Sequence, residues 1–374
     1  MTNAVNLASA AGTGFAFRNR IINGAMEIDQ RNAGASVTIN TTSDAYSVDR
    51  FLGAGQAADG VFTLQQSTTA PAGFKNSLVA TVTTADASIG AAQYYLIAQK
   101  IEGFNCSDLA FGAASAKTVT LSFWVRSSVT GTFSGALANG AYNRSYPFTY
   151  TISSANTFEY KTVTIAGDTT GTWLTDNGIG LRIYWNLGSG VDNTGTAGAW
   201  VGAGNIGADS TVALISTLNA TFYLTGVQLE VGSVATPFER RLYGQEVALC
   251  QRYFCKSSSL NVVPVNGAAY TTAGMFFSSV AGAYYTTAAY TPFMKFPVTM
   301  RTEPATITIY NTNLPSPSTA GQWSIFSPSG GVWYNCSVSA QSVTQEGWAA
   351  ALAGSWGSTG ALPLYGAWAA SAEL

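Results

Sequence analysis

The stretch Gly226-Val227-Gln228-Leu229-Glu230-Val231-Gly232-Ser233 decides how the central part of this chain is interpreted. Its valines and leucine alternate with polar residues, which is the period-two pattern of a strand with one apolar face. The glycine and serine at its end indicate a tight exit from that strand. Pro237-Phe238-Glu239 and then Cys250-Gln251-Arg252-Tyr253-Phe254 follow, and they predict a short amphipathic turn after the strand.

The same alternation recurs on both sides of this stretch. Val119, Leu121, Phe123 and Val125 share one face of a predicted strand, with polar residues and a tryptophan opposite. Further strands are predicted for residues 61–66, 78–83, 94–101, 146–153, 158–165, 179–187 and 221–229. Turns rich in Gly, Asn, Asp, Ser and Thr separate them, without intervening amphipathic helices. This pattern favours an antiparallel sandwich or jelly roll.

One helix is predicted beyond this region, with Thr236 as its N-cap, Pro237 at the first helical position and Glu239 completing a capping box. The strand pattern then restarts, at residues 305–310, around three tryptophans, and at 364–370. We therefore predict an all-β chain, in which a short helix joins a jelly-roll β-sandwich to a smaller β-sandwich-like domain. The predicted ranges are an N-terminal segment at 1–17, the jelly roll at 18–245 and the C-terminal domain at 246–374.

Composition narrows the function classes. Hydrophobic residues make up 47% and aromatic residues 12% of the 374 residues, so there is enough apolar surface to bury and disorder is excluded. No apolar run is long enough for a transmembrane helix. The net charge of −2 is scattered, without the clustered cations that nucleic acid requires. Residues 1–17 do not have the pattern of a secretory signal.

The chain has no histidine, which removes Ser-His-Asp, Cys-His and zinc-type chemistry, and we predict no cofactor and no metal. The four cysteines, Cys106, Cys250, Cys255 and Cys336, are expected to be buried free thiols, although Cys250 and Cys255 could approach each other.

Two motifs suggest other chemistry. Gly202-Ala203-Gly204-Asn205-Ile206-Gly207 matches a dinucleotide-binding string, but it lies in an all-β run without the helix that this site needs, so we interpret it as a loop. A glycosidase would need two carboxylates across a sugar bond. The candidate pairs are Glu27 with Asp29, expected to share a strand face, and Asp44 with Asp49. Asp49 is more simply an ion-pair partner of Arg50.

Several blocks, in order along the chain, resemble a module of bacteriophage tail-fibre and receptor-binding proteins. The opening is Asn19-Arg20-Ile21-Ile22-Asn23-Gly24-Ala25-Met26-Glu27-Ile28-Asp29-Gln30-Arg31 with Tyr46-Ser47-Val48-Asp49-Arg50-Phe51. The middle is Leu121-Ser122-Phe123-Trp124-Val125 with Gly131-Thr132-Phe133, then Gly167-Asp168-Thr169-Thr170-Gly171-Thr172-Trp173. The blocks quoted first close it, so the resemblance covers residues 18–256. The ending Ser371-Ala372-Glu373-Leu374 is similar to the tails of phage fibre tips.

The resemblance implies a carbohydrate-binding-like jelly roll, a homotrimer and attachment to the virion. The expected function is adhesion: a tail-fibre protein, made in the host cytoplasm and carried on the virion, that binds host surface polysaccharide. Residues 1–17 would dock on other virion or baseplate proteins. No catalysis is expected, and neither nucleic acid nor a membrane is an expected partner. The alternatives are a structural virion protein, such as a capsid decoration or head fibre, and a polysaccharide depolymerase.

Aromatic residues are the candidates for ligand contact, because flat rings stack on sugars while their polar edges form hydrogen bonds. More than half of the tryptophans lie in the last third of the chain, in Gly/Ser-rich context. The predicted receptor-binding tip is therefore the C-terminal domain, with five candidate residues: Trp323, Trp333, Tyr334, Trp348 and Trp356. Each of these is also a candidate for the core or for a trimer interface.

Overall fold

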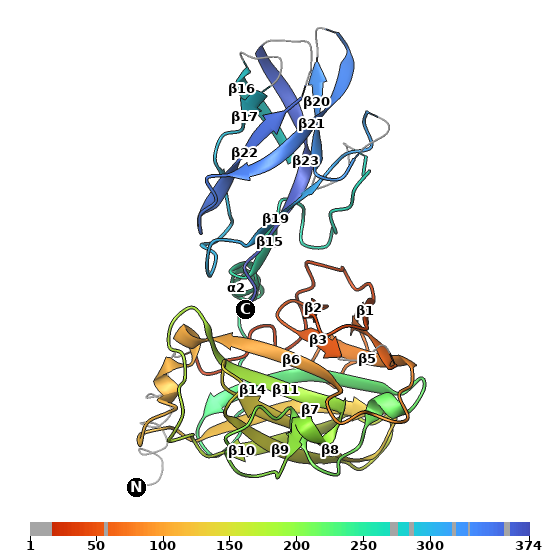
Figure 1. The fold of residues 1–374 in the computed structure, drawn as a ribbon, viewed down its shortest axis with the longest axis vertical. Helices are drawn as coiled ribbons and strands as arrows, with labels where there is room; N and C mark the ends of the chain where they lie inside the picture. The colour runs from red at the N-terminus through yellow and green to blue at the C-terminus, as the bar shows by residue number, and fades with distance from the viewer. Residues whose placement is uncertain are drawn as a thin grey trace.

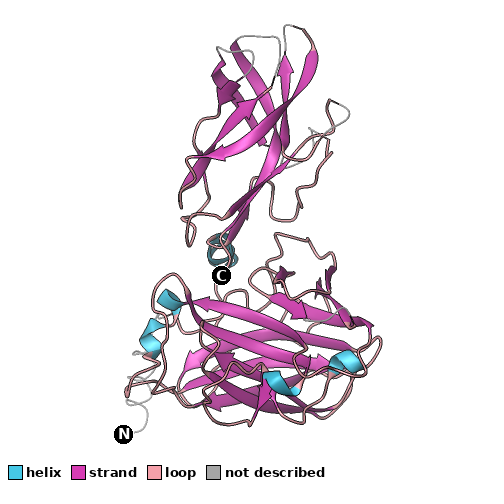
Figure 2. Ribbon diagram, viewed as in Figure 1, coloured by secondary structure: helices cyan, strands magenta, loops and turns pink. Residues whose placement is uncertain are grey.

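The structure is a computed structural model that describes residues 17–55, 59–269, 276–283, 288–315, 319–327, 330–354 and 360–374. Figure 1 shows a larger β domain below and a smaller one above, with the C-terminus returning to the junction between them. Strands dominate both domains (Figure 2). Apart from Phe17, the predicted N-terminal segment lies outside the described residues. No helix in the described ranges is long and apolar enough to cross a bilayer.

The larger domain is a jelly-roll-like sandwich of two six-stranded sheets, as predicted. The strands of the first sheet, in spatial order, are β1 (Val37–Ile39), β4 (Val61–Ser67), β5 (Ser77–Thr84), β14 (Thr221–Val231), β7 (Val119–Ser127) and β10 (Glu159–Ile165). Those of the second are β2 (Ala45–Tyr46), β3 (Leu52–Gly55), β6 (Tyr94–Glu102), β11 (Ile179–Ser189), β8 (Gly131–Ala138) and β9 (Ser145–Ile152). Neighbouring strands in both sheets are antiparallel.

The core lies between the two sheets and follows the alternation in the sequence. Leu121, Phe123 and Val125 from the first sheet are fully buried in one cluster with Ile183 and Trp185 from the second. The alternate residues point away from this core. Since a strand exposes successive side chains to opposite faces, the outward positions of the second sheet form a separate surface, which the next section describes.

Buried polar groups join the opening block of the sequence to the closing one. The side-chain amide of Asn19 donates to the carbonyl of Val227 at 3.0 Å, and its oxygen accepts from the backbone N–H of Leu229 at 3.1 Å. The carboxylate of Glu239 accepts from the backbone N–H of Asn19 at 2.8 Å. A polar group buried without a partner costs free energy, so these residue types are needed where the opening and closing blocks of the larger domain meet.

The helix at the junction begins later than predicted. Helix α2 spans Tyr243–Gln251, so the predicted start at Thr236 is wrong. The Thr236 hydroxyl instead donates to the carboxylate of Glu230 at 2.6 Å, while Glu239 is bound to the opening block, and neither side chain is available as a cap. The side chain of Gln245 accepts a hydrogen bond from the backbone N–H of the residue directly before α2. The predicted domain boundary after Gln245 falls inside this helix.

The C-terminal domain is built on one nine-stranded antiparallel sheet that folds around its own hydrophobic cluster. Its strands are β15 (Phe254–Lys256), β16 (Phe276–Ala283), β17 (Ala288–Tyr290), β18 (Met294–Lys295), β19 (Thr306–Tyr310), β20 (Gln322–Ser327), β21 (Val332–Gln341), β22 (Gly347–Ala353) and β23 (Gly360–Ser371). Strand β23 pairs with β15, β16, β19 and β20, which makes it the centre of the domain.

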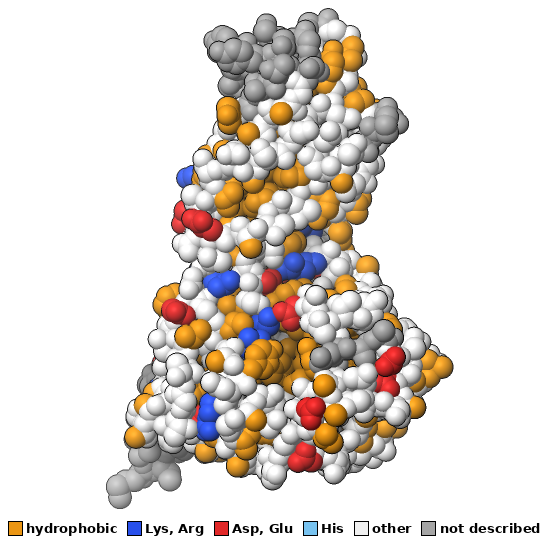
Figure 3. Space-filling model, viewed as in Figure 1, with side chains coloured by type: hydrophobic (Ala, Val, Ile, Leu, Met, Phe, Trp, Pro, Cys, Tyr) orange, Lys and Arg blue, Asp and Glu red, His pale blue; other side chains and the backbone are white. Residues whose placement is uncertain are grey.

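Charged side chains connect the two domains. The guanidinium of Arg252, just after α2, donates to both carboxylate oxygens of Glu102 at 3.0 and 2.6 Å, and the Tyr253 hydroxyl donates to the same carboxylate at 2.8 Å. Arg50 forms an ion pair with Glu373. The predicted pair of Asp49 with Arg50 is therefore wrong. Figure 3 shows charged side chains gathered near the junction of the domains, beside hydrophobic ones.

All four cysteines are free and buried, as predicted. Burial raises the pKa of the Cys255 thiol to about 12. Thiols of this kind are protonated and inert at neutral pH. They act here as small core residues.

Candidate functional site

The outward face of the second sheet carries an apolar floor. Strands β3, β6, β8 and β11 turn one set of alternate side chains away from the core. Together with one residue from a later loop, Ile206, these form a second buried cluster: Leu52, Ala54, Leu96, Ala98, Ala136, Ala138, Tyr184 and Ile206. Four of the eight are alanine. Small side chains next to the ring of Tyr184 leave the face hollow.

A strap of chain, residues 190–208, packs on this face. The strap begins with η3 (Val191–Asn193) and contains β12 (Thr194–Gly195), which pairs in parallel with β13 (Gly207–Ala208). Ile206 packs on the apolar floor, and its backbone N–H donates to the carbonyl of Asn193 at 2.8 Å. The strap contributes lining residues to two cavities.

The first cavity, which we call the tyrosine cavity, has a volume of about 150 Å³. Its walls are Tyr94, Tyr142 and Tyr184, above the floor formed by the small apolar residues. The rings of Tyr142 and Tyr184 are stacked, with centroids 6.3 Å apart and an interplanar angle of 16°. Asp44 and Lys100 supply charges at its rim. An apolar floor, aromatic walls and a few polar groups are typical of small-molecule sites.

Burial shifts the acid–base properties of these walls. Desolvation lowers the pKa of the Lys100 ammonium, and its hydrogen bond to Asp44 opposes that shift. Burial also raises the pKa of Tyr184 well above its usual 10.0 and raises the pKa of Tyr94. The hydroxyls of Tyr184 and Tyr94 therefore remain protonated at neutral pH and can donate hydrogen bonds.

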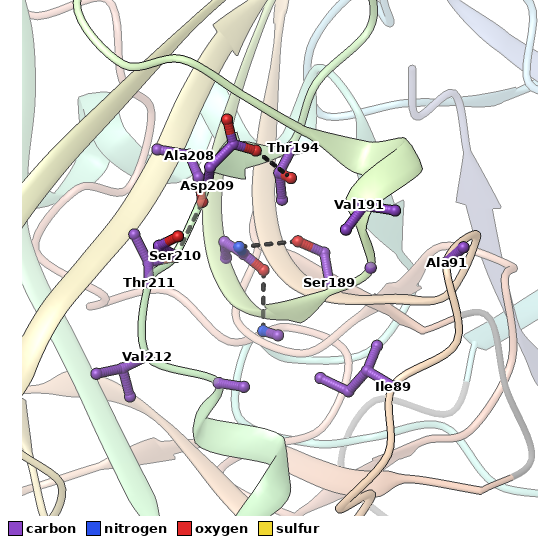
Figure 4. Close-up of a pocket in the computed structure, with 14 residues that line it drawn as sticks. Ile89, Ala91, Ser189, Val191, Thr194, Ala208, Asp209, Ser210, Thr211 and Val212 are labelled. Carbon is purple, nitrogen blue, oxygen red and sulfur yellow. Dashed lines mark hydrogen bonds between the residues drawn. The ribbon is translucent and has the colours of Figure 1, made fainter.

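The second cavity, which we call the hydroxyl cavity, has a volume of about 590 Å³ and is drawn in Figure 4. Thr194 donates to the carboxylate of Asp209 at 2.6 Å across its mouth. The amide of Asn186, which also lines the cavity, donates to the Ser189 hydroxyl at 2.9 Å. Figure 4 shows Ile89 and Val212 opposite these groups, so the cavity has a polar wall and an apolar one.

The five residues predicted in the C-terminal domain are not brought together as one exposed surface. Trp323 and Trp348 are fully buried, with ring centroids 5.8 Å apart inside the cluster of that domain. In the single chain neither ring can contact a ligand, because both lie on the inner face of the sheet. This corrects the prediction for these two residues.

The other three have different positions. Trp333 is half-buried on the opposite face of β21, with its ring 5.0 Å from that of Phe326 and 5.1 Å from that of Tyr365. Tyr334 is half-buried and packs against the inner cluster. Trp356 lies outside the described residues. Of the five, Trp333 is the described residue with its ring on the outer face.

The other motifs have structural roles. The segment from Gly202 to Gly207 is part of the strap, mostly irregular chain without a following helix, so its interpretation as a loop is confirmed. Residues 27–29 are not in a strand, which makes the predicted shared face of Glu27 and Asp29 wrong. The Asp29 carboxylate accepts from the backbone N–H groups of Asn32 and Gly34 at 2.9 and 2.6 Å. Among the described residues no cluster of three acidic or cysteine side chains could hold a metal ion.

Sequence reasoning missed the tyrosine cavity. Tyr94 and Tyr184 occur in predicted strands, and Tyr142 lies in a polar turn, so neither composition nor spacing connects them. A usable signal was the set of small residues at alternate positions of several strands. A strand face lined by alanine beside tyrosine indicates a hollow that a partner can enter.

No protein-family model matches this chain, and no curated protein sequence matches it. Among solved structures, the enzymatically active domain of tailspike protein 4 from bacteriophage CBA120 is similar at 12% identity and a TM-score of 0.28, covering 57% of this chain and 21% of that one. The family 11 carbohydrate-binding module of Clostridium thermocellum, in complex with a mixed-linked tetrasaccharide, has 12% identity and a TM-score of 0.26, covering 52% and 95%.

The N-terminal cellulose-binding domain of β-1,4-glucanase C from Cellulomonas fimi has 13% identity and a TM-score of 0.22, covering 54% of this chain and 90% of that one. Likenesses at these scores carry no argument about function. What the site can do follows from its own geometry. It offers stacking surfaces, hydroxyl donors and acceptors, and one carboxylate in each cavity, a combination suited to binding a polar ring.

Proposed function

We propose that this protein is a bacteriophage tail-fibre adhesin that binds surface polysaccharide of the host cell. The observation that carries the proposal is the tyrosine cavity: three tyrosines around an apolar floor, with Asp44 and Lys100 at its rim. Sugars present both an apolar ring face and hydroxyl edges, and such a cavity complements both. The phage context comes from the order of the sequence blocks that resemble tail-fibre modules.

Binding at one cavity of this size would be weak. Assembly into a homotrimer, which the resemblance implies, would place three copies on one polysaccharide and raise the overall affinity through effective concentration. The N-terminal segment would attach the trimer to other virion proteins. The protein would bind without cleaving, since both cavities hold one carboxylate each, whereas hydrolysis of a glycosidic bond uses a pair.

The test is binding of the purified full chain to a panel of bacterial surface polysaccharides, compared with the variant Tyr94→Ala. Tyr94 is half-buried and lines the cavity. The matched control is Tyr160→Ala, since Tyr160 is 43% exposed on the other sheet and its ring packs against that of Trp124. Loss of an aromatic stacking contact of ~0.5–1.5 kcal/mol corresponds to a weakening of up to about tenfold.

We expect Tyr94→Ala to weaken binding and Tyr160→Ala to leave it unchanged. A third variant, Trp333→Ala, tests the C-terminal site that composition suggested. If only this variant loses binding, adhesion stands but the cavity is not its site. Absence of binding by the full chain to every polysaccharide would favour a structural virion role, and shortening of the polysaccharide would show an enzyme. Light scattering of the same sample measures the number of chains in the assembly.

A further inference from the structure

Arg182 is a buried cation next to the tyrosine cavity. It lies on the outward face of β11, paired in register with Lys100 on β6 and Ala138 on β8. Only 7% of it is exposed. Its guanidinium donates to the hydroxyl of Tyr142 at 2.9 Å and to the carbonyl of Gly140 at 3.1 Å.

Arg182 lacks an acidic partner in the described ranges. Arg182 forms no ion pair with a carboxylate among the described residues, whereas the neighbouring Lys100 has Asp44. The Nε of Arg182 is buried and has no hydrogen-bond partner within the described part of the chain. Buried arginines are ordinarily paired, because a desolvated charge without a counter-charge is costly. Arg182 therefore has a buried charge without a carboxylate partner and an N–H donor that is not used.

Tyr142 covers this cation and also lines the cavity. Its ring centroid lies 4.0 Å from Cζ of Arg182, and 48% of Tyr142 is exposed. Its backbone φ is +57°, a left-handed conformation that a bulky side chain rarely adopts. Strain of this kind concentrates at ligand clamps. The Tyr142 hydroxyl is bound to Nη1 of Arg182, so a shift of Tyr142 would release Nη1 and uncover the guanidinium beside the cavity.

We propose that the tyrosine cavity takes an acidic sugar and that Arg182 binds its carboxylate, with Tyr142 moving from above the guanidinium to admit it. This inference rests on the proposed function and names the ligand class of the same site. A guanidinium edge matches a carboxylate with two parallel hydrogen bonds, which is the strongest neutralisation available to a buried arginine. The sugar ring would lie against Tyr94 and Tyr184, and its carboxylate would supply the missing negative charge.

Two matched ligand pairs test the proposal by isothermal titration calorimetry: oligogalacturonate with its fully methyl-esterified form, and sialyllactose with lactose. Within each pair the acidic member differs in its carboxylate, although sialyllactose also carries an added sugar unit. A glycerol-phosphate oligomer distinguishes phosphate recognition. The variant is Arg182→Gln. The control is Arg126→Gln, because Arg126 also lies over a tyrosine ring, 4.8 Å from that of Tyr223, and donates to a backbone carbonyl.

We expect at least one acidic ligand to bind about tenfold or more tightly than its neutral counterpart, with this preference lost in Arg182→Gln and kept in Arg126→Gln. The preference should also shrink with salt. Equal binding of acidic and neutral members, a preference that survives Arg182→Gln in a folded variant, or binding of the phosphate oligomer alone would overturn the inference. In the first two cases glycan binding itself would stand. The proposed function fails separately, when no saccharide binds at all.

Discussion

The substitution Glu373→Gln should loosen the junction between the domains. The Glu373 side chain is 9% exposed and follows β23 of the C-terminal domain. It pairs with Arg31 at 2.8 Å and with Arg50, whose side chain is 1% exposed. Both arginines belong to the opening blocks of the larger domain. One carboxylate therefore neutralises two arginines across the junction.

The expected loss of stability follows from the contacts that Arg50 would keep after the substitution. Without the carboxylate, its guanidinium retains the carbonyl of Lys100 at 2.6 Å and the ring of Tyr253, 3.6 Å away, but no negative charge. Removing one partner of a buried ion pair costs about 3–5 kcal/mol. Because glutamine can still accept a hydrogen bond, we expect the lower end, about 3 kcal/mol in the free energy of unfolding. For a domain of this size that corresponds to a fall in Tm of roughly 6–12 °C.

Urea unfolding followed by tryptophan fluorescence measures this loss, with Glu346→Gln as the matched control. Glu346 is exposed in the same domain and accepts from the Thr299 hydroxyl at 2.8 Å. Its replacement should change stability by less than about 0.5 kcal/mol. If Glu373→Gln is as stable as Glu346→Gln, the ionic cluster does not hold the domains together and the reasoning fails.

Three further outcomes are expected. Gly24→Ala should destabilise by about 1–3 kcal/mol, since its new methyl group would overlap the carbonyl oxygen of Val227, whereas Gly202→Ala has open space and should be neutral in thermal unfolding. Burial lowers the pKa of Lys256 from 10.5 to about 8, so the folded state holds this proton less tightly than the unfolded state. The contribution of Lys256 to the free energy of unfolding is therefore full above pH 10.5 and is lost as the pH falls through about 8. Lys256→Met should flatten this rise in stability with pH. Burial alone would raise the pKa of Asp168, but hydrogen bonds from an arginine hold this pKa below 3.8. Asp168→Asn should therefore lower the free energy of unfolding at neutral pH. The difference in stability from the native chain should disappear in acid well below pH 3.8.

The strands of the larger domain could be predicted from sequence because their signal is local. Phe123 and Trp185 stand in alternating runs, and the structure buries both in the core between the sheets. The helix start could not be predicted in the same way. Thr236 and Glu239 are good capping residues, but their side chains bind Glu230 and the backbone of Asn19, which is 220 residues away from Glu239. A local preference was overridden by distant partners.

The candidate site depended still more on distant pairing. Aromatic density pointed to the C-terminal domain, where Trp323 and Trp348 prove to face inward. The cavity instead joins Tyr94, Tyr142 and Tyr184 from separate parts of the larger domain. The spacing of these three tyrosines in the sequence does not predict that they line one cavity.

By itself, the sequence determined that the chain is all-β, where most strands of the larger domain run, and that its thiols are buried, because period-two alternation and residue type act over a few neighbouring positions. The tertiary structure alone decided which face of each strand meets solvent and which charged groups meet at the junction. It also decided that Arg182 lies buried beneath Tyr142 without a carboxylate. These depend on the register between strands far apart in the chain, and a shift of one residue would turn every side chain to the other face.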